Sequence, residues 1–242
     1  MPSFWKHVNQ VLREADIIIE VLDARFVEDT RNREIEDKVY RLNKKILYVL
    51  NICDLADLDK VKEETAKLNP CVFISSREKL GTTILKKKIL ELTHGEKVTV
   101  GILGYPNVGK SSLINALSGR AAARTSAESG FTKGLQKVRV DNKIMLIDTP
   151  GVFPKEEKDI VKFGKTSAMS SGKIKDPEYV ALRIIEDQKE KIKKHYSLEE
   201  DEPEEILEKL AVLFKKVRKG KQPDLEGAAR ILLKQWQEGK IK

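Results

Sequence analysis

The sequence predicts an α/β fold with a mainly parallel sheet, followed by a small all-helical C-terminal domain. Two observations carry this prediction. Over roughly the first 150 residues, short apolar runs rich in β-branched side chains alternate with segments whose apolar residues recur at helical spacing. From about residue 153 onward the chain is charged and helical in pattern, with no run typical of a strand. We therefore expect domains at residues 1–152 and 153–242, with the boundary between 152 and 159.

The elements of the first domain are expected in alternating order. An opening amphipathic helix has an apolar face made of Phe4, Val8, Val11, Leu12 and Ala15. Nearly continuous apolar runs, typical of strands buried on both faces, occupy residues 17–22, 46–50, 71–74 and 98–103. Helices are expected at 33–42, 60–68, 83–92 and 112–117. Residues 136–140 and 143–147 flank Asp141-Asn142 and predict a hairpin.

The C-terminal domain is expected to contain helices at about 177–195, 204–217 and 225–238. In the last of these, five apolar residues recur at helical spacing: Leu225, Ala229, Leu232, Leu233 and Trp236. Such a stripe favours a core face over a platform for a ligand.

Residues 104–111 have the pattern G-x-x-x-x-G-K-S and stand between an apolar run and a helical segment. This strand–loop–helix context is typical of a P-loop NTPase, whose backbone N–H groups and helix N-terminus bind nucleotide phosphates. Lys110 is expected to reach the β- and γ-phosphates, and the Ser111 hydroxyl to hold Mg²⁺. The expected nucleotide contacts are Tyr105, Pro106, Asn107, Val108, Gly109, Lys110, Ser111 and Ser112. A glycine loop without this function is the alternative, and both flanks argue against it.

A second motif, Asp148-x-x-Gly151, ends the predicted hairpin. Asp148 is expected to bind Mg²⁺ through a water, and the Gly151 N–H to contact the γ-phosphate. The small, polar residues 120–133 predict a mobile loop, in which Thr132 is the expected second hydroxyl ligand of Mg²⁺. An ordinary loop threonine is the alternative for Thr132.

The loops after the second and third strands predict a base-binding site. In Asn51-x-x-Asp54, the carboxylate can accept from guanine N1–H and the 2-amino group. Adenine lacks that pair of donors, so a buried carboxylate left unpaired would reject ATP. Ser75-Ser76-Arg77 would supply a backbone N–H to guanine O6. Loop capping by Asn, Asp and Ser is the alternative.

The order of these motifs predicts a circularly permuted sheet, because the base-binding loops precede the phosphate loop. Ligands gather at the carboxyl ends of the strands in such sheets, so permutation leaves the site intact. It also means that the segment from Asp148 to Gly151 leads directly into the C-terminal helices. We hypothesise that nucleotide state is mechanically coupled to those helices.

Composition points to a polyanionic partner. The chain of 242 residues has a net charge of +8, and five of its cations lie between residues 215 and 221. Those cations could neutralise RNA phosphates, and a solvated helix end is the alternative. Two cysteines without metal-ligand spacing, no apolar run long enough to span a membrane and no signal peptide favour a cytoplasmic protein.

The chain resembles the circularly permuted GTPases of ribosome assembly, the YlqF/YawG family. The motifs that carry the resemblance are Asp23-Ala24-Arg25, residues 51–54, 104–111, 130–132 and 148–151, and the tail segments 222–226 and 228–230. The resemblance implies a slow GTPase switch that docks on the large ribosomal subunit or its precursor, with a C-terminal domain that touches ribosomal RNA. GTP or GDP and Mg²⁺ are the expected ligands. Neither membrane nor DNA is an expected partner, and a monomer is expected.

The chain departs from the family pattern in its base-binding motifs and near its N-terminus. The family usually has N-K-x-D, but Ile52 stands where the lysine would buttress the phosphate loop, so nucleotide affinity is expected to be lower. The S-A-K-like motif is Ser75-Ser76-Arg77, a mild change. Bacterial members carry a histidine implicated in hydrolysis near the N-terminus; His7 lies too close to the first strand for that role, and a surface helix position is expected.

Two further features concern hydrolysis. Val152 follows Gly151 where many GTPases have a water-orienting glutamine, so unassisted hydrolysis is expected to be slow. The resemblance suggests a substitute, because Asn107 occupies the position of an asparagine that helps bind K⁺ in cation-dependent relatives. The alternative is that Asn107 only stabilises the loop turn.

Three functions remain open from the sequence. The leading one is a GTP-hydrolysing assembly factor for the large ribosomal subunit. The second is a GTP-binding RNA module with negligible hydrolysis, motivated by Ile52 and Val152. The third is an ATPase with the same phosphate loop.

Overall fold

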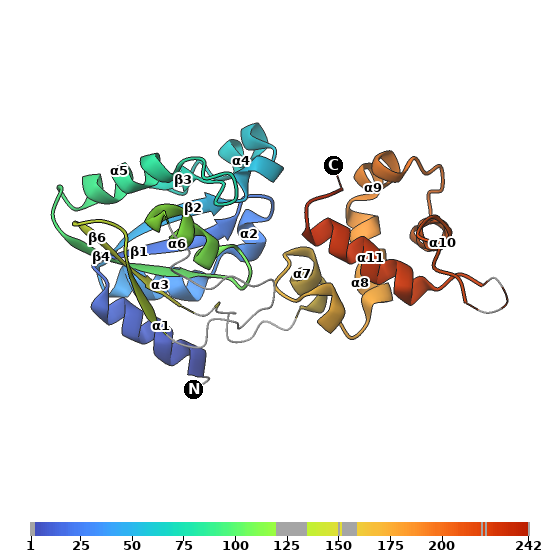
Figure 1. Cartoon of the computed structure of the whole chain (residues 1–242), viewed down its shortest axis with the longest axis horizontal. Coiled ribbons are helices and arrows are strands. Elements are labelled where there is room, and N and C mark those ends of the chain that lie inside the picture. Colours follow the sequence, from blue (N-terminus) through green and yellow to red (C-terminus); the bar gives the residue numbers. More distant parts are fainter. Residues whose placement is uncertain are drawn as a thin grey trace. The chain divides into compact units, whose positions relative to one another are not determined.

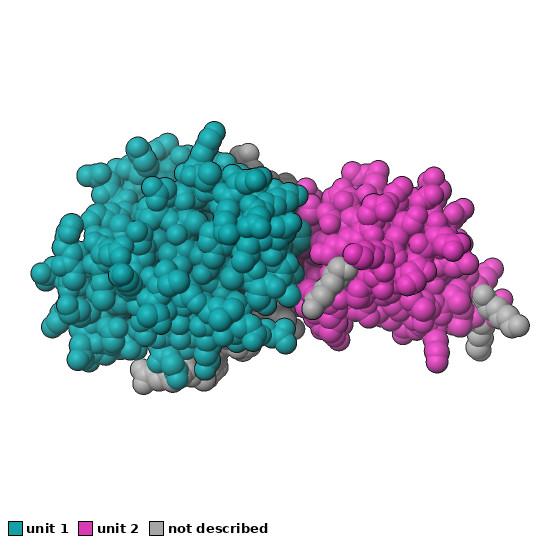
Figure 2. Space-filling model, turned by 90° about the horizontal axis from the view of Figure 1, so that it is seen from above, with its two compact units in different colours: residues 1–157 teal, residues 158–242 magenta. Residues whose placement is uncertain are grey.

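The computed structural model describes residues 3–119, 135–149, 151, 159–218, 220 and 222–241. Thr132 and Val152, with the whole of the segment 130–132, lie outside these residues. The chain divides into two compact units, Met1–Glu157 and Lys158–Lys242, which Figure 2 shows in different colours. Among the described residues, no helix has both the length and the apolar character needed to cross a membrane.

The first unit contains a six-stranded sheet in the order β3-β2-β1-β4-β6-β5 (Figure 1). All neighbouring strands are parallel except β5 and β6, which form the expected antiparallel hairpin. The strands are β1 (Ile17–Asp23), β2 (Lys45–Asn51), β3 (Cys71–Phe73), β4 (Val98–Gly104), β5 (Gln136–Arg139) and β6 (Ile144–Asp148). The helices are α1 (Ser3–Glu14), α2 (Val27–Thr30), α3 (Arg33–Arg41), α4 (Leu58–Glu64), α5 (Thr82–Leu92) and α6 (Lys110–Ser118), with a 3₁₀ turn, η1 (Cys53–Leu55). The mainly parallel α/β sheet predicted from the sequence is confirmed.

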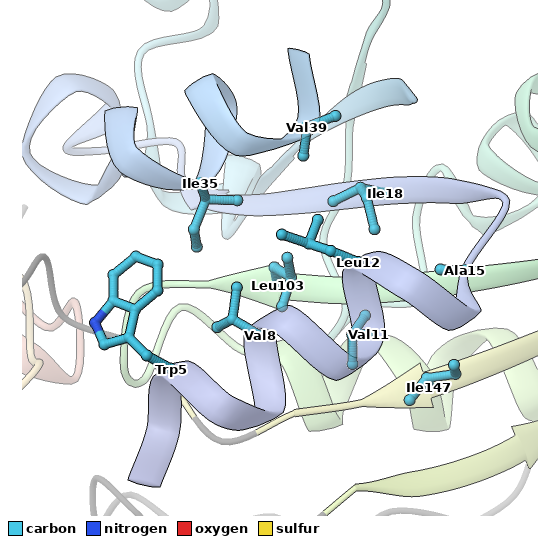
Figure 3. Close-up of a cluster of buried hydrophobic side chains, with 10 residues drawn as sticks. All are labelled: Trp5, Val8, Val11, Leu12, Ala15, Ile18, Ile35, Val39, Leu103 and Ile147. Atoms are coloured by element: carbon cyan, nitrogen blue, oxygen red, sulfur yellow. The ribbon is translucent and has the colours of Figure 1, made fainter. Parts of the chain in front are cut away.

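The core under α1 shows why the apolar runs form a sheet covered by helices. The apolar face of α1 packs on strands β1, β4 and β6 and on α3 (Figure 3). The buried residues of this cluster are Trp5, Val8, Val11, Leu12, Ala15, Ile18, Ile35, Val39, Leu103 and Ile147. Gly101 lets α1 approach β4, since a Cβ there would lie 2.4 Å from a methyl of Val11. The opening helix expected from apolar patterning therefore packs against three of the strands and against α3.

The described residues of the second unit form helices and one 3₁₀ turn. They are α7 (Ile160–Lys165), the 3₁₀ turn η2 (Ser171–Lys173), α8 (Pro177–Asp187), α9 (Lys189–Tyr196), α10 (Pro203–Leu213) and α11 (Leu225–Gln237). The expected stripe on α11 is mostly core, with Ala229, Leu232, Leu233 and Trp236 buried and Leu225 half-buried. Asp176 and Asp224 accept from backbone N–H groups at the starts of α8 and α11 and cap them.

Three expected elements differ from the structure. The single helix expected at 177–195 is broken at Gln188, which has a non-helical φ of −128°. The helix expected at 204–217 ends at Leu213, because Lys215 adopts a left-handed φ of 55° and the Lys216 N–H returns to the Ala211 carbonyl. The helix expected at 60–68 corresponds to α4, which ends at Glu64. Helix α2 stands between β1 and α3, where the sequence analysis named no helix.

Candidate nucleotide-binding site

The carboxyl ends of the parallel strands bring the predicted motifs to one edge of the sheet. The strand order reverses direction between β1 and β4, and ligands of open α/β sheets bind at such a switch point. The loop after β4 contains residues 104–111, and the loops after β2 and β3 contain the predicted base-binding residues. The motif that starts at Asp148 closes β6 at the same edge.

Two glycines give the phosphate loop its shape. Gly104 has a φ of 147° and Gly109 a φ of 91°, values that side chains of L-residues rarely adopt. A Cβ at Gly104 would lie 2.4 Å from the Val21 carbonyl oxygen, and one at Gly109 would lie 2.3 Å from Nδ2 of Asn51. The loop therefore packs against both β1 and the end of β2. Asn107 is also left-handed, with a φ of 61°.

Lys110 opens α6 and folds back along the loop. Its Nζ donates to the carbonyl oxygens of Gly104 at 3.1 Å and Tyr105 at 2.7 Å, and the residue is only 6% exposed. Burial lowers the pKa of Lys110 to about 8, and the nearby Asp148 carboxylate opposes this shift. Within the described part of the chain its hydrogen-bond partners are both carbonyl oxygens, so this buried cation would gain from an anion placed against the loop.

Asp148 and Ser111 form an oxygen-rich corner beside Lys110. The Ser111 hydroxyl donates to Oδ2 of Asp148 at 3.1 Å. Oδ1 of Asp148 is buried, and no described residue hydrogen-bonds to it. Burial raises the pKa of Asp148, while Lys110 and Ser111 act against that rise. These oxygens fit Mg²⁺, which protein sites usually hold through one or two carboxylates, phosphates and water.

Asn51 joins two loops through both the nitrogen and the oxygen of its side-chain amide. Its Nδ2 donates to the Val108 carbonyl at 2.8 Å, and its Oδ1 accepts from the N–H of Ser76 at 3.0 Å and from the Ser76 hydroxyl at 2.8 Å. The residue is 2% exposed. Asn51 therefore braces the phosphate loop against the loop after β3.

An open cavity of about 700 Å³ lies between these loops. From the predicted set it is lined by Asn51, Asp54, Ser75, Ser76, Arg77, Asn107, Gly109 and Ser112. Asp54 is exposed at this cavity, not buried as the sequence argument supposed. Ile52 also lines it, in a left-handed conformation (φ 63°) that is strained for a β-branched residue. The base-binding and phosphate-binding loops thus border one space.

Other predicted residues take different places. The side chains of Tyr105, Pro106 and Val108 are buried, so these residues can offer only backbone groups to a ligand. Gly151 approaches the phosphate loop so closely that a Cβ there would lie 2.6 Å from Cα of Pro106. His7, expected on a helix surface, is instead half-buried, and its Nδ1 is buried without a hydrogen-bond partner among the described residues.

The cavity has a further wall that the sequence argument missed. Asn115, Ala116 and Gly119 line it from the end of α6, and Leu55 and Lys79 line it from the base side. The α6 residues follow Ser112 at intervals of three, four and seven positions, so helical spacing could have identified them. Leu55 and Lys79 carry no comparable signal.

Comparison with known proteins agrees with this geometry. A family model described as a 50S ribosome-binding GTPase matches residues 99–216. A GTP-binding protein of Methanocaldococcus jannaschii is 40% identical over 98% of this chain and 65% of its own length. The GTPase grn1 of Schizosaccharomyces pombe is 31% identical over 99% of this chain and 61% of its own length. The chain thus spans about two thirds or less of the length of these curated relatives.

Solved structures extend the comparison to the fold. GNP-bound YlqF from T. maritima superposes with a TM-score of 0.72 at 25% identity, covering 98% of this chain and 94% of YlqF. The GDP-bound form of that protein gives a TM-score of 0.69. The sheet and its site define a P-loop GTPase fold in circularly permuted order. Among circularly permuted GTPases, this chain is similar to YlqF over nearly its whole length.

Proposed function

We propose that the protein is a slow GTP-hydrolysing switch that binds the large ribosomal subunit or its precursor and assists its assembly. The observation that supports it best is the brace at Asn51. One amide joins the phosphate loop at Val108 to the base-side loop at Ser76, and both loops border the cavity that Asp54 lines. A single nucleotide in that cavity would contact both sets of motifs.

Guanine recognition is assigned to the base-side loops. The exposed carboxylate of Asp54 is available to accept from guanine N1–H and the 2-amino group. Ser75, Ser76 and Arg77 border the same end of the cavity, where a backbone N–H would meet guanine O6. Adenine would leave Asp54 desolvated and unpaired, which is the basis for rejecting ATP.

The phosphate side is assigned to the loop and its neighbours. Lys110 would exchange its carbonyl partners for the β- and γ-phosphates, with N–H groups of the loop and of Gly151 around them. Ser111 and Asp148 would hold Mg²⁺, with Thr132 as a further ligand. When bound, Mg²⁺ neutralises charge on the phosphates. Asn107 is assigned to K⁺, which would compensate for the apolar Val152.

The ribosomal partner is supported by the matching family's description and by the positive net charge of +8. We assign nucleotide binding to residues 1–152 and contact with ribosomal RNA to residues 153–242. The proposal includes a monomer in the cytoplasm, with neither membrane nor DNA as a partner.

The second candidate is a GTP-binding RNA module with negligible hydrolysis. Ile52 favours it, because the strained residue places no donor beside the base or the phosphate loop. Phosphate release measured with and without K⁺ and large subunits separates the two, since only the switch should be stimulated.

Co-sedimentation with large ribosomal subunits tests the main proposal. Binding should be stronger with a non-hydrolysable GTP analogue than with GDP, and excess GTP but not ATP should compete for the nucleotide site. Equal sedimentation in both nucleotide states would contradict a switch.

A further inference from the structure

A second cavity lies at the edge of the sheet opposite to the nucleotide site. It has a volume of about 210 Å³ and is bordered by the start of β4, the end of β5 and the turn that leads into β6. The phosphate loop and Asp148 lie at the carboxyl ends of β4 and β6, whereas this cavity borders the amino ends of the same strands. The seven residues of β4 separate the two places by about 20 Å. The second cavity is therefore not part of the nucleotide site.

Hydrogen bonds fix the turn that forms one wall of this cavity. Oδ1 of Asp141 accepts from the backbone N–H groups of Lys143 and Ile144, at 2.8 and 2.9 Å. The Val98 N–H donates to the Lys143 carbonyl at 2.8 Å and joins the turn to the start of β4. An aspartate that accepts from its own backbone in this way defines the shape of a turn. The cavity thus has walls held by the backbone.

Three exposed cations border the cavity, namely Lys97, Arg139 and Lys143. Nζ of Lys143 donates to the Gly95 carbonyl at 2.6 Å, and Nε of Arg139 donates to the Asp141 carbonyl at 3.1 Å. These acceptors are neutral backbone oxygens, so they orient the two cations without cancelling their charge.

Much of the donor capacity of these cations is unused. Nη1 and Nη2 of Arg139 and Nζ of Lys97 have no hydrogen-bond or ion-pair partner among the described residues. Asp141 is the one carboxylate among the described residues that line the cavity. Next to it, Oδ2 of Asp16 accepts from the Thr99 N–H at 2.8 Å. Positive charge therefore exceeds negative charge here, and a guanidinium with two free nitrogens suits the oxygens of a phosphate.

The lining of the cavity favours a phosphodiester backbone over an acidic protein as the source of that phosphate-like anion. Its apolar members Val98 and Ile144 are buried and Met145 is half-buried, so the exposed lining is charged or polar. Protein interfaces have an apolar centre, whereas contacts with a nucleic-acid backbone need only cations and polar donors. The net charge of +8 on the whole chain agrees with a polyanionic partner.

We propose that this cavity binds a backbone phosphate of RNA in the large ribosomal subunit, so that the first unit has an RNA contact of its own beside the one assigned to residues 153–242. The inference rests on the proposed ribosomal partner. Arg139 would donate to two phosphate oxygens, with Lys97 and Lys143 beside them. Because the cavity lies at the edge of the sheet away from the nucleotide, its contribution to binding should be equal in the GDP and GTP states.

The test measures binding of the whole chain to intact large ribosomal subunits and to protein-free RNA of that subunit, over a series of KCl concentrations. Lys97→Gln with Arg139→Gln removes two charges and keeps Lys143, whose Nζ holds the Gly95 carbonyl. This variant should bind both probes about tenfold more weakly, and the slope of log K against log salt should fall by about 1.5. The loss should be the same with GDP and with a non-hydrolysable GTP analogue, and GTP affinity should not change.

Lys67→Gln with Lys87→Gln is the matched control, because it removes two exposed charges from the same unit. Neither lysine lines either of the two cavities or has a partner among the described residues. The control should keep nearly the wild-type affinity and salt slope.

The proposal is wrong if the Lys97/Arg139 variant binds RNA as the control does, or if its loss is confined to one nucleotide state. A loss seen with intact subunits but not with protein-free RNA would contradict it too, and would indicate a protein partner. Should the double variant not fold, Lys97→Glu decides the question, since Lys97 has no hydrogen bond to lose within the described chain: a loss of about tenfold supports the proposal and no loss overturns it. A wild-type protein that binds neither probe would overturn the proposed ribosomal function itself.

Discussion

At the scale of single residues, Lys110 shows how function is set against stability. The sequence predicted it within the phosphate loop, with the helix starting at 112, whereas in the structure α6 begins at Lys110 itself. The sequence could not show that the side chain is buried against two carbonyl oxygens, with its pKa lowered to about 8. That shift depends on atoms brought together only by folding.

Lys110→Met should abolish binding of GTP and raise the melting temperature, because it removes a buried charge while keeping a similar side-chain length. A gain of about 1–2 kcal/mol in the free energy of unfolding is expected.

The pKa of Lys110 is lower in the folded state than in the unfolded state. The destabilisation caused by burying its charge is therefore present in full below pH 8 and shrinks as pH rises from about 8 to 10.5. Thermal unfolding at pH 7 and pH 10 measures both effects, with Lys87→Met, an exposed position on α5, as the control. A lower melting temperature for Lys110→Met at pH 7 would contradict the argument.

Asp54→Asn should shift the nucleotide preference from guanosine to xanthosine diphosphate, because the amide would donate where the carboxylate accepts. The exchange in preference should be at least about a hundredfold. Competition titrations with the two nucleotides measure it. Asp59→Asn, an exposed change on α4, serves as the control; an unaltered preference in Asp54→Asn would remove this residue from base recognition.

At the scale of elements, β1 was expected as a strand buried on both faces, and all seven of its residues are buried. One of them, Glu20, is charged in ordinary water yet fully buried here. Its Oε1 accepts from the Asn32 N–H at 2.8 Å, whereas Oε2 has no partner among the described residues. Burial is the main cause that raises the pKa of Glu20 to about 8, with the nearby Glu36 adding to it.

Glu20→Gln should remove a pH dependence from the stability of the first unit. The folded pKa is raised, so between about pH 4.5 and pH 8 the folded state keeps a proton that the unfolded state has lost. Wild-type stability should therefore fall by a few kcal/mol across that window. Denaturant unfolding at pH 5, 7 and 9 should show a flatter profile for Glu20→Gln and an unchanged one for the exposed Glu63→Gln.

Helix ends were the weakest part of the sequence-based expectations. Ile185 and Ile192 are seven residues apart and would share a face of one straight helix, so their spacing did not reveal the break at Gln188. Likewise α10 ends at Leu213, and Lys215 just beyond it adopts a left-handed conformation in which glycine is usual. Tertiary packing, not local pattern, decides both ends.

At the scale of the whole molecule, charge and architecture bear on the ribosomal partner. Of the cations expected to meet RNA, Lys215, Lys216 and Arg218 lie in the described part of the chain and are exposed. Arg218 pairs with Asp224 at 3.1 Å, so Lys215 and Lys216 are better suited to meet phosphates.

Lys215→Glu with Lys216→Glu should weaken co-sedimentation with large subunits and reduce its salt dependence, by about two units in the slope of log K against log salt. Lys60→Glu with Lys62→Glu reverses two exposed charges in the first unit and is the control. GTP binding should be unaffected in both. An unchanged salt slope would show that the Lys215 and Lys216 side chains do not contact RNA.

The sequence by itself determined the alternation of strands and helices, the phosphate loop and the permuted order of the motifs. The periodicity of apolar residues and the spacing of glycines can both be read from short stretches of sequence. Only the tertiary structure decided that Asn51 is a brace, reaching 57 positions to Val108 and 25 to Ser76. It also decided the α6 wall of the cavity and the burial of the Glu20 carboxyl. Such contacts join residues that are far apart in the chain. They impose no periodic pattern on the sequence between those residues, so the sequence does not reveal them.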